Sequence, residues 1–490
     1  MPILTPRMQQ TIDVDALVIG AGEAGALVAS LAVDAGASVA LAYREPWGST
    51  CLNAGCVPSK FLIHRARVAH VVRTSSRFGV RNGAPDVDLA GIVEEKRRYL
   101  DHHRDESWRG ALREERLTLL QGSAEFVTRD RVRVGDRIVR SDRIFLALGM
   151  RPSVPEVDGV HDGPWLTNET VMDLEEVPGH LIVIGGGYIG CELGQAFRRF
   201  GAEVSIVQRA PRLLPEEEPD ASTVIERAFR EEGIDVLTGH WLRSVRWADG
   251  RPTVEASDPE GTSRSLEGSH LLVASGRTPN TDTLALERAG VELDPRGFVR
   301  VDDELRTTAA GVWAIGDVNG LQPFTRVCQE EAKIAFANAF HDAGLRMRRD
   351  ALPHAVFTDP EVGSVGLTER AAREKGHDVI AGLVPFGRIE KAELIGETEG
   401  FIKYIADRDT HRLLGCHVVG YEAADLVYDA VVVMRAEGMI DDLALAVGVF
   451  PTLQEGMEGV ARAVLRKAAP EEVSGPLVTA VHRGIKGGGD

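Results

Sequence analysis

Two glycine-rich loops constrain the fold of this chain more than any other feature of its sequence. Each loop has glycine at its first, third and sixth positions, follows a short apolar run and leads into a segment of helical composition. A second apolar run comes after each helical segment, at residues 37–42 and at residues 203–207. This order of strand, loop, helix and strand is that of a Rossmann unit. The six glycines are Gly20, Gly22, Gly25, Gly185, Gly187 and Gly190.

The repetition matters because a single G-x-G-x-x-G loop is weak evidence, whereas two loops in the same context are much stronger. Glycine at these positions lets the backbone approach a pyrophosphate group with no Cβ in the way. The N-terminus of the following helix then offers free N–H groups and the positive end of its dipole. We therefore predict an α/β protein with two Rossmann-like dinucleotide-binding domains. A tight strand-to-helix turn without a ligand is the plainer alternative for each loop.

Cys51 and Cys56 follow the first glycine loop, and their short spacing allows a small, easily reduced disulfide. A nucleotide site beside a sulfur pair indicates a redox enzyme in which the nucleotide cofactor supplies electrons to the sulfurs. The alternative is half of a zinc site. That alternative is weak because no second cysteine pair occurs at ligand spacing, so we expect no metal site.

The composition favours a soluble protein of a reducing compartment. The 490 residues are 43% hydrophobic and 27% charged, and the net charge is −18. Such an acidic chain is a poor candidate for binding nucleic acid or an anionic membrane surface. Five cysteines in so long a chain do not make a secreted disulfide framework. Because we find neither a signal peptide nor an apolar run long enough to span a bilayer, we expect a cytoplasmic protein.

The cysteine block at residues 48–60 belongs to a longer pattern. Residues 308–318 contain the pair Gly316 and Asp317, and residues 357–368 read FTDPEVGSVGLT. With these motifs the chain resembles the flavin-dependent pyridine nucleotide-disulfide oxidoreductases over roughly residues 13–467, and its second glycine loop most resembles that of mercuric reductases. The resemblance implies a homodimer in which the C-terminal domain of one subunit completes the active site of the other.

The resemblance also assigns the segments of the chain. The C-terminal third reads as an α+β domain, with helical stretches at residues 423–437 and 456–467. Residues 471–490 are expected to form a flexible, glycine-rich tail. The other expected parts are an FAD-binding domain at residues 1–160, an NAD(P)-binding domain at 161–290, a central part of the FAD-binding domain at 291–350 and the dimerisation domain at 351–470.

The resemblance further implies roles for individual residues. Cys56 lies against the flavin and passes electrons as a thiolate, while Cys51 is the outer sulfur that attacks the substrate. Lys60 and Glu192 match an ion pair beside flavin N5, and Tyr188 matches a tyrosine that covers the flavin until nicotinamide displaces it. The plain alternatives are unrelated surface charges and a core aromatic residue. The residues expected to bind the two cofactors are Gly20, Gly22, Gly25, Glu45, Gly48, Thr50, Gly149, Asp317, Gly185, Gly187, Gly190, Gln208, Arg209 and Gly276.

Two positions that follow the glycine loops depart from the usual pattern. An NAD site normally carries an acid at the end of the second strand, whereas this chain has Gln208 followed by Arg209. A neutral amide beside a cation suits a 2′-phosphate, so we expect NADPH rather than NADH, with a solvated surface charge as the alternative for Arg209. In the first domain Tyr43 takes the place of the acid. Either Glu45 has taken over its contact with the adenosine ribose, or the adenosine is held differently.

A third departure decides which electron acceptors are plausible. Thiol-disulfide members of the family carry a His-Pro dipeptide followed by glutamate, and here the segment reads Phe450, Pro451 and then Glu455. Phenylalanine cannot move a proton, and loss of a general acid–base typically costs ~10²–10⁴-fold in rate. A soft metal ion binds thiolates directly and needs no proton on sulfur. Mercuric reductases likewise have a residue other than histidine at this position.

We therefore hypothesise a mercuric reductase-like oxidoreductase that passes electrons from NADPH through FAD to the Cys51–Cys56 disulfide and on to a soft metal ion. Against a dedicated mercuric reductase, residues 478–490 lack a cysteine pair and nothing precedes the FAD fold. A small disulfide, an electrophilic oxidant such as hypothiocyanous acid and a quinone remain alternative acceptors. His354, His411 or His417 could supply a proton to a disulfide substrate, although none lies at the matching position. A flavin-binding sensor without turnover is a further alternative.

Overall fold

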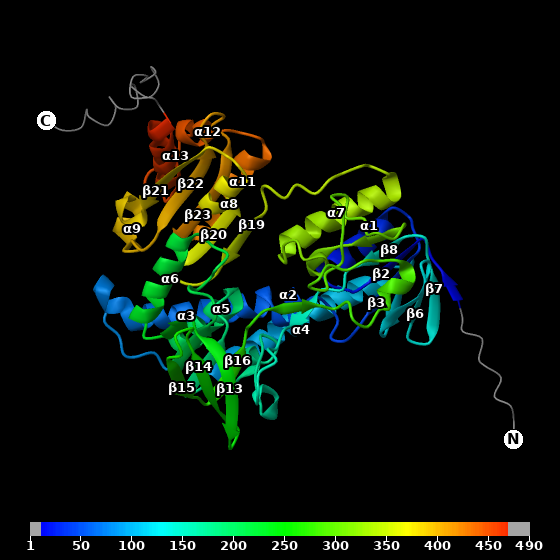
Figure 1. The fold of residues 1–490 in the computed structure, drawn as a ribbon, viewed down its shortest axis with the longest axis horizontal. Coiled ribbons are helices and arrows are strands. Elements are labelled where there is room, and N and C mark those ends of the chain that lie inside the picture. Colours follow the sequence, from blue (N-terminus) through cyan, green and yellow to red (C-terminus); the bar gives the residue numbers. More distant parts are fainter. Residues whose placement is uncertain (1–10, 469–490) are drawn as a thin grey trace.

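The computed structural model describes residues 11–468, and its first unit is built on a parallel sheet of five strands (Figure 1). Helix α1 (Glu23–Asp34) connects the first two strands of the chain that enter this sheet. The central strands are buried along their whole length, which is typical of a parallel sheet covered on both faces. The strands in spatial order are β18 (Val312–Ala314), β8 (Ile144–Leu146), β2 (Ala16–Ile19), β3 (Val39–Tyr43) and β4 (Leu117–Gln121). The first predicted Rossmann unit is therefore confirmed.

The second unit repeats the arrangement with a parallel sheet of four strands. Helix α5 (Tyr188–Phe200) begins inside the second glycine loop, with Gly187 as its N-cap. The loop and the first helical turn are therefore continuous. Helix α6 (Pro219–Glu231) follows the second strand. The strands in spatial order are β12 (Asp235–Thr238), β11 (Glu203–Gln208), β10 (His180–Ile184) and β16 (His270–Val273).

Small sheets whose strand pairs are antiparallel, apart from one parallel pair, connect and flank the two parallel sheets. The chain leaves the first unit through β9 (Met150–Pro152) and returns through β17 (Arg277–Pro279), and these two strands pair with each other. One flanking sheet contains β1 (Thr11–Asp13), β7 (Arg137–Arg140), β6 (Arg131–Val134) and β5 (Ala124–Thr128), and the other contains β13 (Trp241–Ala248), β14 (Arg251–Ser257) and β15 (Ser263–Glu267).

The C-terminal domain combines an antiparallel sheet of five strands with short helices and one longer helix, so the expected α+β domain is confirmed. The predicted helix at residues 423–437 is divided at Val427 into two helices. The strands in spatial order are β19 (Pro353–Val356), β20 (Glu361–Gly366), β23 (Leu413–Gly420), β22 (Phe401–Asp407) and β21 (Val379–Pro385), and the helices are α8 (Glu369–Glu374), α9 (Glu390–Ile395), α10 (Ala423–Leu426), α11 (Tyr428–Arg435), α12 (Ile440–Leu445) and α13 (Gln454–Ala468).

Three long helices were not anticipated from the sequence: α3 (Cys56–Thr74), α4 (Leu89–Arg113) and α7 (Thr325–His341). Helix α3 packs against α5 of the second unit (Figure 1). Its buried residues include Leu62 and Ala66, one helical turn apart, which form a single apolar face. This contact brings the start of α3, where Cys56 lies, close to the second unit.

The expected tail at residues 471–490 lies outside the described part of the chain. Between residues 11 and 468, none of the helices combines the length and the apolar character needed to cross a bilayer.

Candidate active site

The two cysteines of the redox block lie on consecutive helices. Cys51 is on α2 (Thr50–Ala54), and Cys56 is the first residue of α3. Ser49 caps α2, because its Oγ accepts a hydrogen bond from the Leu52 N–H at 3.1 Å. Both cysteines are free thiols, and Cys51 is half-buried while Cys56 is exposed. Cys56 therefore stands at the positive end of a long helix, a position that favours a thiolate.

Electrostatics distinguish the two sulfurs. The pKa of Cys56 is lowered to about 6, and the hydrogen bond with the Cys51 thiol is the largest cause. A hydrogen bond with Thr325 and the charge of Lys60 also lower this pKa, whereas partial burial of the sulfur acts in the opposite direction. The Thr325 Oγ1 lies 3.6 Å from the Cys56 Sγ. The shared hydrogen bond and burial both raise the pKa of Cys51. At neutral pH, Cys56 is therefore the thiolate and Cys51 is the thiol that donates to it.

Lys60 and Glu192 form the ion pair that the resemblance implied. Lys60 lies one turn after Cys56 on α3, and its Nζ is 2.8 Å from the Glu192 Oε2. Glu192 is buried on α5, and its Oε1 accepts a hydrogen bond from the Phe357 N–H at 2.9 Å. The Lys60 Nζ also lies 4.4 Å from the centre of the Phe357 ring, within cation–π range. Both carboxylate oxygens of Glu192 are thus engaged, and the pair joins α3, α5 and the C-terminal domain.

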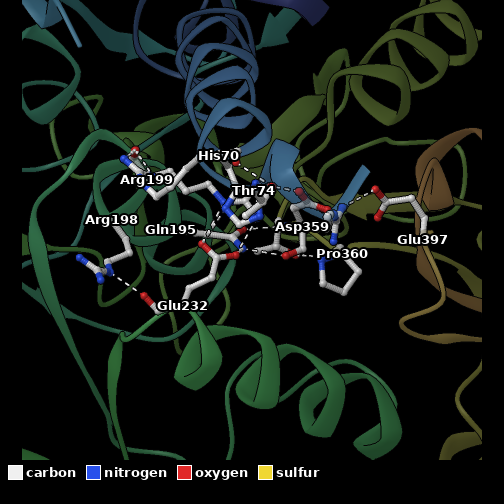
Figure 2. Close-up of polar contacts among 12 residues, drawn as sticks. His70, Thr74, Gln195, Arg198, Arg199, Glu232, Asp359, Pro360 and Glu397 are labelled. Carbon is white, nitrogen blue, oxygen red and sulfur yellow. Dashed lines mark hydrogen bonds and ion pairs between the residues drawn. The ribbon is translucent and has the colours of Figure 1, made fainter. Parts of the chain in front are cut away.

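A buried network of ion pairs and hydrogen bonds continues along α5 from this pair (Figure 2). Arg199, which is 5% exposed, donates to both carboxylate oxygens of Glu232 at 2.6 and 2.9 Å and to the Asp359 Oδ2 at 2.7 Å. Gln195 bridges the same partners, since its Nε2 donates to the Glu232 Oε1 at 2.8 Å and to the Asp359 carbonyl at 2.7 Å. His70 of α3 faces Glu232. A cavity of about 190 Å³ is lined by members of this network and of the ion pair.

The first glycine loop fits a dinucleotide pyrophosphate. A Cβ on Gly20 would lie 2.2 Å from the Ala147 carbonyl oxygen, and Gly20 has a φ of +110°. A Cβ on Gly25 would lie 1.9 Å from the Gly20 carbonyl oxygen, so the loop and helix pack closely only with glycine. A Cβ on Gly22 would meet only the Ser49 Cβ, at 3.9 Å, and no side chain caps α1. The N–H groups of the first turn are therefore available to a phosphate.

The second glycine loop has the same construction. A Cβ on Gly190 would lie 1.9 Å from the Gly185 carbonyl oxygen, whereas nothing lies within 4 Å of a Cβ on Gly187. No side chain caps α5. The two loops are thus equivalent cradles, and the residues present fit the two dinucleotides that the sequence predicts.

The end of β11 presents the residues expected to choose between NADH and NADPH. Gln208 is buried beneath the glycine loop and donates to the Arg212 carbonyl at 3.4 Å. Arg209, the next residue, is exposed. The exposed cation at this edge is therefore Arg209, with Gln208 serving the packing of the loop.

At the corresponding edge of the first unit, Tyr43 is buried in an aromatic cluster. Its ring packs against Trp47 and Trp108 at centroid distances of 5.1 and 5.6 Å. Glu45 is exposed, and its Oε2 accepts a hydrogen bond from the Trp47 N–H at 3.0 Å. Tyr43 thus belongs to the core, and Glu45 is the exposed carboxylate of this turn. Two further expected residues follow it, Gly48 with a φ of +103° and Thr50 at the start of α2.

Asp317 lies beside β17, one of the two paired strands through which the chain leaves and re-enters the first unit. Its Oδ2 accepts a hydrogen bond from Arg277 at 2.9 Å, and its Oδ1 lies 3.6 Å from the Cys328 sulfur. Gly149 and Gly276, both with positive φ, immediately precede the strands β9 and β17. Arg277 therefore holds in place the acid that the resemblance assigns to the flavin.

Phe450 and Glu455, the two expected site residues near the C-terminus, belong to the C-terminal domain. Phe450 is 66% exposed, and the Glu455 Oε1 accepts a hydrogen bond from the Thr452 N–H at 3.0 Å. Each of the three histidines considered as a proton source is engaged with another group: His354 with Glu217, His411 with Asp441 and His417 with Ser364.

Three residues of the site were not given a role from the sequence: Thr325 beside Cys56, Phe357 on the ion pair and Arg277 on Asp317. Phe357 and Arg277 lie in conspicuous motifs. Thr325 has no local signal, because its contact with Cys56 spans 269 residues.

Comparison with known proteins identifies the family. Residues 14–342 match the family described as pyridine nucleotide-disulphide oxidoreductase, and residues 352–461 match the dimerisation domain of that family. The chain belongs to the pyridine nucleotide-disulphide oxidoreductases. Members of this family depend on FAD and use NAD(P)H. The resemblance seen in the sequence and the expected use of FAD with NAD(P)H are therefore confirmed, and the preference for NADPH over NADH stays a prediction.

Relatives within the pyridine nucleotide-disulphide oxidoreductases carry names that describe different activities. A mercuric reductase of Bacillus cereus is 34% identical over 446 residues, which are 91% of this chain and 70% of the relative. A dihydrolipoyl dehydrogenase of Haloferax volcanii is 33% identical over 92% of this chain and 96% of its own length. A solved structure, the HOCl-induced flavoprotein disulfide reductase RclA from Escherichia coli, has a TM-score of 0.81 and 29% identity, covering 92% of this chain and all of that one.

Proposed function

We propose that this oxidoreductase passes electrons from NADPH to the Cys51–Cys56 pair and then to a soft metal ion. FAD held at the first glycine loop would supply the hydride-accepting chemistry that links reduced nicotinamide to the sulfur pair. Cys56, with a pKa lowered to about 6, is the inner thiolate that faces the flavin. Cys51 is the outer sulfur that meets the acceptor. The Lys60–Glu192 pair keeps a fixed positive charge one turn from Cys56.

Each cofactor has its own set of residues in this proposal. Gly20, Gly22 and Gly25 hold the FAD pyrophosphate at the N-terminus of α1. The second loop holds the nicotinamide dinucleotide in the same way. The exposed Arg209 favours the 2′-phosphate of NADPH, and Tyr188 covers the nicotinamide position until the ring enters.

The choice of acceptor depends on one observation, that Phe450 stands before Pro451 in place of a histidine. In this proposal the C-terminal domain of a second subunit brings Phe450 to the sulfur pair. Exposed apolar side chains close to it in sequence support such a dimer surface; they are Met439, Leu445, Val447 and Val449. A phenyl ring cannot protonate a leaving thiolate, and a metal ion bound by two thiolates does not require it. Because this proposal needs a second subunit, light scattering of the holoenzyme should give the mass of a dimer.

A second candidate acceptor is an electrophilic oxidant or a small disulfide. The observation that favours it is the likeness to a reductase described as HOCl-induced, at a TM-score of 0.81. The dihydrolipoyl dehydrogenases among the relatives add a disulfide as an option. A quinone is the remaining alternative.

The deciding experiment is a steady-state panel in which NADPH and NADH are each paired with Hg(II), glutathione disulfide, lipoamide, hypothiocyanous acid and a quinone. We expect turnover of Hg(II) with NADPH, little turnover of the two disulfides, and loss of Hg(II) turnover in Cys51→Ser and Cys56→Ser. In Phe450→His we expect faster disulfide reduction with little change for Hg(II). Rapid disulfide turnover by the wild type would contradict the argument from Phe450. Full activity of either cysteine variant would contradict the whole electron path.

A further inference from the structure

Glu217 is a buried carboxylate that the chemistry above leaves without a role. It lies in the segment between β11 and α6 and is 2% exposed. Its Oε1 accepts a hydrogen bond from the Tyr188 hydroxyl at 3.2 Å and is 2.7 Å from the His354 Nε2. Its Oε2 accepts a hydrogen bond from the Ser364 hydroxyl at 2.7 Å. One side chain of the second unit thus receives a donor from that unit and two donors from the C-terminal domain.

The surroundings keep Glu217 ionised. Burial alone would raise its pKa, but hydrogen bonds from His354 and Ser364, together with the charge of His354, outweigh burial and hold the pKa below its usual value. Burial, followed by the charge of Glu217, raises the pKa of Tyr188. The phenol therefore stays protonated, and it can only donate to the carboxylate. A hydrogen bond to a charged acceptor is stronger than one between neutral groups.

Tyr188 joins the second glycine loop to the N-terminus of α7. It is the first residue of α5, directly after Gly187. Its ring packs against Phe324 and His354 with centroid distances of 6.0 and 5.9 Å. The residue after Phe324 is Thr325, whose hydroxyl is 3.6 Å from the Cys56 sulfur. In the proposed function, a nicotinamide ring held at the second glycine loop therefore has to displace the Tyr188 ring.

We propose that Glu217, supported by His354, is a latch that holds Tyr188 in the closed position and so sets the affinity for the nicotinamide cofactor. This inference rests on the proposed role of Tyr188 as the cover of the nicotinamide position. When the phenol leaves, Glu217 keeps its partners His354 and Ser364, so its charge remains compensated. The closed and open states therefore differ by one hydrogen bond to a charged acceptor. Glu217 and His354 are positioning residues, since they act on the cofactor only through Tyr188.

The test compares the dissociation constant of NADP⁺ in three variants of the holoenzyme: Glu217→Gln, Tyr188→Phe and the double variant. A latch lowers the fraction of enzyme that can bind, and its removal raises that fraction. Tyr188→Phe removes the hydrogen bond, and we expect it to bind NADP⁺ about tenfold more tightly, which corresponds to about 1.4 kcal/mol. Glu217→Gln replaces the charged acceptor by a neutral amide oxygen and should tighten binding by a smaller factor. The double variant should bind no more tightly than Tyr188→Phe, because both changes act on the same bond.

A matched pair at the supporting position separates positioning from packing. His354→Gln retains an N–H donor for Glu217 and should leave the dissociation constant within about twofold, whereas His354→Ala should move it towards the value of Glu217→Gln. If Glu217→Gln does not fold, Tyr188→Phe alone still tests the latch, because it keeps the other two partners of Glu217.

The outcomes distinguish the two proposals. Wild-type holoenzyme that fails to bind NADP⁺ would overturn the proposed function. Wild-type enzyme that binds, together with unchanged or weaker binding by Tyr188→Phe, would overturn the latch alone. Additive effects in the double variant would also overturn it, since they would show that Glu217 and Tyr188 act independently.

Discussion

Removing the thiol of Cys51 should raise the pKa of Cys56, because the hydrogen bond between them has the largest effect on that pKa. A hydrogen bond to a charged group contributes about 1.5–3 kcal/mol, and one pKa unit corresponds to about 1.36 kcal/mol. Cys51→Ala should therefore raise the pKa of Cys56 from about 6 to roughly 7–8. At pH 6.5 the thiolate fraction of Cys56 would fall from about three quarters to about one quarter or less.

The assay is the rate of iodoacetamide alkylation of Cys56 in reduced holoenzyme, followed from about pH 4.5 to 9.5 by peptide mass spectrometry. Only the thiolate reacts, so the rate rises with pH through the pKa. Cys51 and Cys56 fall in one tryptic peptide, residues 45–60, and fragment ions assign the label to one or the other. The three remaining cysteines, Cys191, Cys328 and Cys416, are buried and provide an internal control for unfolding.

The matched control is Cys51→Ser, whose hydroxyl can still donate to the thiolate. We expect its Cys56 pKa to stay near 6, well below that of Cys51→Ala. A Cys56 pKa in Cys51→Ala equal to that of the wild type would refute the hydrogen-bond argument. Equal increases in the serine and alanine variants would assign the effect to the size or polarisability of sulfur rather than to donation.

Three further variants test other parts of the site. Lys60→Met removes the charge opposite Glu192 and should slow the reduction of the holoenzyme by NADPH by about 10²-fold in stopped-flow absorbance, whereas an unchanged rate would exclude a role in this step. Arg209→Gln should raise KM for NADPH about tenfold and leave KM for NADH unchanged, and equal effects on both cofactors would contradict recognition of a 2′-phosphate. Arg199→Met leaves the half-buried carboxylates of Asp359 and Glu232 without their cation (Figure 2). This should cost up to about 3–5 kcal/mol and lower the calorimetric midpoint of the holoenzyme, and an unchanged midpoint would show that the network is dispensable.

The two Rossmann units could be predicted because their signals are local. A buried strand, a glycine loop and a helix follow one another within about thirty residues, and the apolar runs are nearly continuous. Helix α4 had no such signal, although its buried positions Leu89, Val93, Lys96 and Leu100 follow a helical stripe. The stripe is interrupted by Lys96, which is buried because its Nζ donates to the Met172 carbonyl and to Asp173. The groups that stabilise the buried Lys96 lie far along the chain, so the helical pattern of α4 could not be recognised from its local sequence.

The residues of the candidate site likewise fall into those with a local sequence signal and those without one. The sulfurs and glycines were evident, because each belongs to a short motif whose spacing has a physical reason. The Lys60–Glu192 pair spans 132 positions and was expected only from family resemblance. The contact of Glu217 with His354 spans 137 positions and could not be anticipated, since nothing in either local sequence specifies the other. Pairings of this kind depend on how the domains pack.

Glu192 and Glu217, two of the buried glutamates of the second unit, differ in a way that suits their different tasks. Glu192 has two donors that are part of the fixed scaffold, Lys60 and a backbone N–H, so its position is the same whether or not a ring enters. Glu217 has one donor, the Tyr188 phenol, that belongs to a side chain able to rotate, and two others that remain. An unpaired buried charge would cost several kcal/mol. Tyr188 can therefore move away from Glu217 at low cost only if Glu217 keeps other hydrogen-bond donors. His354 and Ser364 remain as donors, so Glu217 meets that condition.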